Sequence, residues 1–230
     1  MGFIPSEFQR VQGDGEIKTI FFCDSNMVPN SVPDNTLFVS KEKAQIHEFT
    51  QLITFFDDSF TDSRLNFVVF CLGSSDISHA DKQLVFNDKL QSLDYHVTKN
   101  REFRYVSQCF NVLLSSIVEL KTVDKLISFD VMSRSSSGFH NAGVEFINRR
   151  VEKVNDVHAH YNTWKRYQQD MRKRKDKETK NFPIRSELFD DVDNGILKSD
   201  EKDKLAAAAV DALSNEGNLV IRDATFLRKF

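Results

Sequence analysis

A nearly continuous hydrophobic run, LNFVVFCL, occupies residues 65–72. A run of this length is typical of a strand in the middle of a parallel sheet that helices cover on both faces. A shorter β-rich run at 18–22 ends in the polar residues 24–26 (DSN), and predicts a buried strand followed by a loop. Residues 123–131 contain another short apolar run, which predicts a third strand.

Hydrophobic positions at three- and four-residue intervals predict helices between these strands. Residues 40–56 place Ser40 as a helix N-cap ahead of a regular apolar series. The Ala-rich stretch at 204–214 has high intrinsic helix propensity. Further helices are predicted over residues 81–94, 103–120 and 138 to about 167.

The alternation of strands with helices predicts the α/β class, as a three-layer sandwich with a central parallel sheet flanked by helices. We expect an irregular N-terminal lead-in over residues 1–16 and one domain over 17–230. Loops that carry function in such sheets lie at the carboxyl ends of the strands. Because Ser25 and Gly73 each follow a predicted strand, we expect both at the same edge of the sheet.

Composition limits the classes of function. The 230 residues are 40% hydrophobic and 28% charged, which is typical of a globular protein, and the net charge is -3. Three cysteines without paired spacing predict neither a disulfide framework nor a zinc site, so we expect no metal and no cofactor. The absence of a signal-like start or a long apolar run favours a cytoplasmic or nuclear protein without membrane contact.

Three short segments carry candidate chemistry: residues 21–26 (FFCDSN), 70–77 (FCLGSSDI) and 193–199 (DNGILKS). In order and spacing they resemble the catalytic blocks of SGNH (GDSL-type) hydrolases. That family has a Gly-Asp-Ser turn after its first strand, a Gly-x-Asn-Asp block after a later strand and an Asp-x-x-His block before its last helix. The resemblance implies an SGNH-like fold, with Ser25 at the nucleophile position.

The same resemblance places Gly73 and Ser75 at the oxyanion positions, and Asn194 and Leu197 at the positions of the acid and the base. Asn194 has no carboxylate, and Leu197 cannot accept a proton. A serine hydroxyl is a poor nucleophile without a base, and losing triad members costs several orders of magnitude in rate. We therefore expect a pseudoenzyme, with an active serine esterase that uses Ser25 and an unrecognised base as the alternative.

A replacement base could come from residues 155–160 (NDVHAH), which contain one aspartate and two histidines. His158 or His160 would reach Ser25 only if this predicted helix folded over the edge of the sheet. The interpretation that we favour places both histidines on a solvent-facing helix surface.

A basic segment at residues 165–180 carries eight lysines and arginines against three acidic residues, and aromatic residues precede it. Basic side chains beside aromatic rings suit contact with a phosphate backbone and base stacking. The alternative is a solvated surface, or internal pairing with the acidic residues that follow. The candidate nucleic-acid contacts are Lys165, Arg166, Arg172, Lys173, Arg174, Lys175, Lys177 and Lys180.

Two SGNH-like precedents inform this hypothesis. The OSK domain of Oskar resembles an SGNH hydrolase without its catalytic residues and binds RNA, and esterase-like domains occur in the first-frame proteins of some retrotransposons. By analogy we expect a degenerate domain that binds RNA or single-stranded nucleic acid. A protein-interaction scaffold, which could self-associate, stays open.

Overall fold

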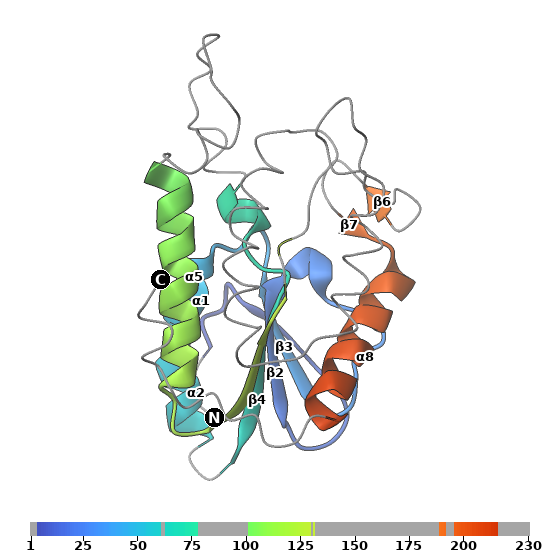
Figure 1. Cartoon of the computed structure of the whole chain (residues 1–230). Coiled ribbons are helices and arrows are strands. Elements are labelled where there is room, and N and C mark those ends of the chain that lie inside the picture. The colour runs from blue at the N-terminus through green and yellow to red at the C-terminus, as the bar shows by residue number, and fades with distance from the viewer. Residues whose placement is uncertain are drawn as a thin grey trace.

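A five-stranded sheet forms the centre of the computed structural model, which describes residues 4–60, 63–77, 101–129, 131, 189–191 and 196–215 (Figure 1). The strand order is β1-β3-β2-β4-β5. Neighbouring strands from β3 to β5 run parallel, and β1 joins the edge of β3 in the antiparallel direction. The strands are β1 (Gln9–Gln12), β2 (Thr19–Asp24), β3 (Thr36–Lys41), β4 (Leu65–Phe70) and β5 (Val123–Ser128).

Helices cover both faces of this sheet. Figure 1 shows α1, α2 and α5 on one face and α8 on the other. A short 3-10 helix, η1, follows β2, and the strands β6 and β7 form a separate antiparallel pair. The bounds are η1 (Ser25–Met27), α1 (Ile46–Thr50), α2 (Ile53–Ser59), α5 (Arg101–Val118), β6 (Phe189–Asp191), β7 (Ile196–Leu197) and α8 (Ser199–Asn215). The predicted α/β class is confirmed, with a sheet that is mostly parallel.

Strand β2 contributes to two hydrophobic cores. Ile20 and Phe22 belong to the larger cluster, which also contains residues of α1, α2 and α5. Phe21 and Cys23 point the other way and belong to the cluster that includes the buried residues of α8. Since all four side chains are fully buried, residues 20–23 are apolar on both faces of the strand, and polar residues occur only at its ends.

The predicted helix over residues 40–56 is wrong at its beginning. Ser40 is not an N-cap but a fully buried residue of β3, opposite Cys23 of β2. The N-cap of α1 is Gln45, and the side chain of Glu48 accepts a hydrogen bond from its amide, which completes a capping box. The apolar series then continues through two helices, α1 and α2, that are separated by residues 51 and 52.

Strand β1 lies within residues 1–16, where the sequence predicted no regular element. All four of its residues are exposed because β1 is the edge strand, so no hydrophobic alternation marks it.

The remaining predicted elements within the described residues are confirmed with shifted ends. The strands predicted at 18–22, 65–72 and 123–131 are β2, β4 and β5, and the helices predicted at 103–120 and 204–214 are α5 and α8. The helices predicted over 81–94 and 138–167 lie outside the described residues, as does the basic segment. No helix among the described residues is long and apolar enough to cross a membrane.

A matched pair of substitutions tests the core on the α8 side of the sheet, to which Val68 belongs. Val68 of β4 is fully buried, whereas Val112 of α5 is 53% exposed. Val68→Ala removes buried methyl groups and leaves a cavity, so we expect the free energy of unfolding in urea to fall by about 2–3 kcal/mol. Val112→Ala should change it by less than about 0.5 kcal/mol. Equal losses in the two variants would contradict this core.

Candidate functional site

The loops after β2 and β4 meet at a reversal in the strand order. From β2 the chain moves outward to β3, and then returns through α1 and α2 to β4 on the other side of β2. In open α/β sheets, such a switch point at the carboxyl ends of the strands is where ligands bind. Ser25 begins η1 directly after β2, and Gly73 lies in the turn after β4. The structure thus places both residues at the same edge of the sheet.

A hydrogen bond joins these two loops. The Ser75 hydroxyl donates to Asp24 Oδ2 at 3.3 Å, across 51 positions of the chain. The other oxygen of the same carboxylate, Oδ1, accepts a hydrogen bond of 3.1 Å from the Asn26 amide and so caps η1. Ser25 is half-buried between these contacts. Asp24 was not among the site residues predicted from the sequence, although its place directly before Ser25 was a signal.

The turn after β4 has an unusual backbone. Cys71 is buried and has a φ of 52°, a left-handed conformation that costs energy for a residue with a side chain. Gly73 follows with a φ of 112°. A Cβ at this position would lie 2.8 Å from Phe110 Cε2 and 3.2 Å from Val131 Cγ2. Only glycine therefore fits where the turn packs against Phe110 of α5. Gly73 is therefore held in this conformation by the side chains around it.

Asp76 anchors the other side of this turn. Its carboxylate is 6% exposed and accepts hydrogen bonds from the Ile46 amide, at 3.1 Å to Oδ2 and 3.3 Å to Oδ1. Burial raises the pKa of Asp76 to about 7, although the hydrogen bond from Ile46 acts in the opposite direction. Asp76 was not among the site residues predicted from the sequence, because nothing local to the second block indicates its contact with α1.

The segment before the last helix brings an apolar side chain close to the turn of Ser25. β7 packs against η1, which brings the segment before the last helix to the turn of Ser25. Leu197 is fully buried there, in the same cluster as Cys23 and Met27. The loop after η1 is also tied to α8, since the amides of Asn30 and Ser31 donate to Asp203 Oδ1 at 2.8 and 3.1 Å. Asn194 lies outside the described residues.

Among the described residues, few groups could supply acid–base or metal chemistry. The described residues include one histidine, His47 of α1. Within the described part of the chain, the Ser25 hydroxyl forms no hydrogen bond. All three cysteines are buried and form no disulfide, and burial raises the pKa of the Cys23 thiol well above its usual range. No cluster of three His, Cys, Asp or Glu side chains that could hold a metal occurs in the described ranges.

Comparison of the chain with protein-family models, with curated proteins and with solved structures found no match. The four parallel strands follow one another in space as second, first, third and fourth along the chain. This order is shared by doubly wound α/β folds with many functions, so the sheet shows an α/β fold and no particular family.

Replacing Asp76 should change how stability depends on pH. The raised pKa means that the folded protein holds a proton between about pH 4 and pH 7 that the unfolded chain has lost. The carboxylate therefore lowers stability as the pH rises through this window. Asn cannot ionise, so the Asp76→Asn variant does not lose this stability. We expect the unfolding free energy of the variant minus that of wild type to increase by about 2–3 kcal/mol from about pH 5 to about pH 8.

Urea unfolding at the two pH values measures this effect. Asp34→Asn, at an exposed aspartate in the loop before β3, is the matched control and supplies the baseline for the same chemical change. If Asp76→Asn followed this control at both pH values, burial of the carboxylate would not be a source of the pH dependence.

Proposed function

We propose that this chain is a catalytically degenerate SGNH-like domain that acts as a binding module, with RNA or single-stranded nucleic acid as its ligand. The loss of catalytic activity rests on one observation, the burial of Leu197 against the turn of Ser25. The sequence of the basic segment supports nucleic acid as the ligand.

The packing around η1 supports the loss of catalytic activity. In an SGNH hydrolase the block before the last helix delivers the acid and the base to the nucleophile. In this chain the segment before α8 also reaches the turn of the candidate nucleophile, since β7 packs against η1. It delivers the Leu197 side chain, which packs with Met27 in the hydrophobic core. Without a general base in that place, the Ser25 hydroxyl is not activated by the usual route.

The concentration of basic residues at 165–180 supports binding of nucleic acid. The whole chain is slightly acidic, yet residues 165–180 hold eight basic and three acidic side chains. Such a concentration of positive charge attracts phosphates irrespective of the net charge of the protein. Tyr161, Trp164 and Tyr167 lie in or just before the segment and offer rings on which unpaired bases stack.

We expect salt-dependent binding to a fluorescein-labelled single-stranded RNA of about 20 nucleotides, measured by anisotropy. Each phosphate contact on a single strand contributes a slope of about −0.7 in log K against log salt concentration. The double variant Lys173→Ala/Lys175→Ala should therefore flatten the slope by about 1.4 and weaken binding at low salt.

The matched control for this titration is Lys18→Ala/Lys43→Ala, which removes two exposed lysines outside the segment. It should bind as wild type does. A lack of salt-dependent binding to any RNA or DNA, or equal losses in both double variants, would remove nucleic acid from the proposal.

The competing hypothesis is an active esterase, which the half-buried Ser25 at the switch point favours. On our proposal, hydrolysis of p-nitrophenyl acetate by Ser25→Ala stays within about twofold of wild type. Ser74→Ala, at a half-buried serine of the neighbouring loop, is the control. Activity that disappears in Ser25→Ala alone would establish the enzyme and refute the pseudoenzyme.

A further inference from the structure

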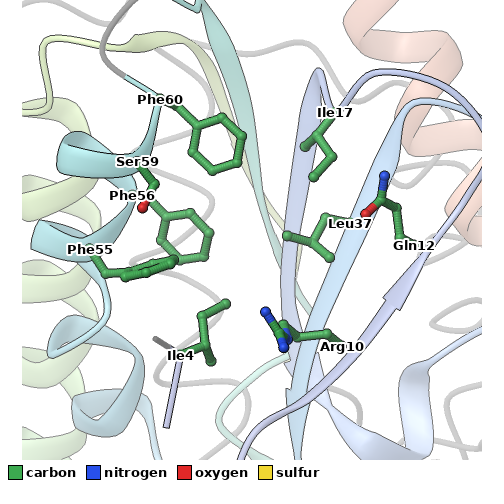
Figure 2. A pocket seen from close by; sticks show the side chains of 9 residues that line it. All are labelled: Ile4, Arg10, Gln12, Ile17, Leu37, Phe55, Phe56, Ser59 and Phe60. Carbon is green, nitrogen blue, oxygen red and sulfur yellow. The ribbon is translucent and has the colours of Figure 1, made fainter. Parts of the chain in front are cut away.

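A cavity of about 280 Å³ lies on the α2 side of the sheet, beside the edge strand β1 (Figure 2). Phe55 and Phe56 of α2 form one wall with Phe60, which directly follows this helix, and Ile17 and Leu37 lie across from them. Leu37 is the second residue of β3, and Ile17 lies just before β2. The cavity is therefore at the amino ends of the parallel strands, whereas Ser25 and Gly73 follow their carboxyl ends.

The cavity is a place where the larger core is incompletely covered. Among the described residues, three partly buried hydrophobic side chains pack against that core, Ile17, Phe55 and Phe60, and all three line the cavity. Apolar surface that remains open to water favours a ligand whose own apolar body would cover it. The volume exceeds the roughly 150 Å³ of an engineered cavity that binds benzene, so a ring with a short chain fits.

One positive charge faces this apolar space. Arg10 and Gln12 are two positions apart on β1, so their side chains project from the same face of the strand. Figure 2 shows the guanidinium of Arg10 directed into the space near Ile4. Among the described residues no carboxylate forms an ion pair with Arg10. A guanidinium binds a carboxylate through two parallel hydrogen bonds, which fixes the orientation of the ligand.

We propose that this cavity, whose lining residues include none of the proposed nucleic-acid contacts, binds a small organic carboxylate with an apolar body. The apolar body lies between the three phenylalanines and the facing Ile17 and Leu37. The carboxylate lies at the mouth and accepts hydrogen bonds from Arg10. The Ser59 hydroxyl, which also lines the cavity, is a second donor on the side of α2.

Isothermal titration of the full chain with 4-phenylbutyrate and with its uncharged amide, 4-phenylbutanamide, tests the charge. We expect the carboxylate to bind roughly tenfold more tightly than the amide, because only the carboxylate pairs with the guanidinium. Arg10→Gln should remove this preference. Arg104→Gln, at an exposed arginine of α5 that does not line the cavity, should retain it.

Ser59→Leu tests the cavity itself, because the larger side chain occupies the space of the apolar body. We expect binding of both probes to fall at least tenfold, while the thermal midpoint stays equal to that of wild type or rises, because the new side chain buries apolar surface. Three results would overturn the proposal: no binding of either probe to wild type up to about 5 mM, equal behaviour of the two arginine variants, or unchanged binding in Ser59→Leu. None of them bears on the RNA titration, which depends on residues 165–180.

Discussion

Burial of β2 on both of its faces is the constraint on which the rest of the described structure depends. Residues 20–23 have no exposed surface, so α1, α2 and α5 must cover one face of the sheet and α8 the other. Phe21 stacks on Phe38 of β3 at a centroid distance of 4.2 Å and meets Phe70 of β4 edge-on. These ring contacts secure the neighbours of β2 on both sides, and with them the order of the sheet.

The candidate site follows from this arrangement. The parallel register of β2 with β4 brings Asp24 and Ser75 to the same edge, where they form a hydrogen bond. Gly73, packed against Phe110, and Asp76, bonded to the start of α1, hold the second loop in place. The edge is thus well organised, and the buried Leu197 brings an apolar side chain to the cluster that contains Cys23 and Met27. On our proposal, this edge has lost the base that acyl transfer needs.

Local patterns predicted those elements whose burial is uniform or regularly periodic. The apolar run of β4 and the helical series of α5 each carry their signal within a single element. Ser40 misled the prediction because a serine in front of an apolar series suits an N-cap, whereas its real setting is a buried strand that pairs with β2. β1 carried no signal at all, because the residues of an exposed edge strand need not alternate.

Local patterns in the sequence were enough to predict the α/β class and the loop that carries Ser25 after β2. The strand order, the antiparallel edge strand, the hydrogen bond between Asp24 and Ser75, and the burial of Leu197 beside η1 depend on how distant segments pack. So does the cavity, whose walls come from β1, β3 and α2. The reason is that helix and strand periodicity is local, whereas each of these features joins residues far apart in the chain, and packing alone selects which of them meet.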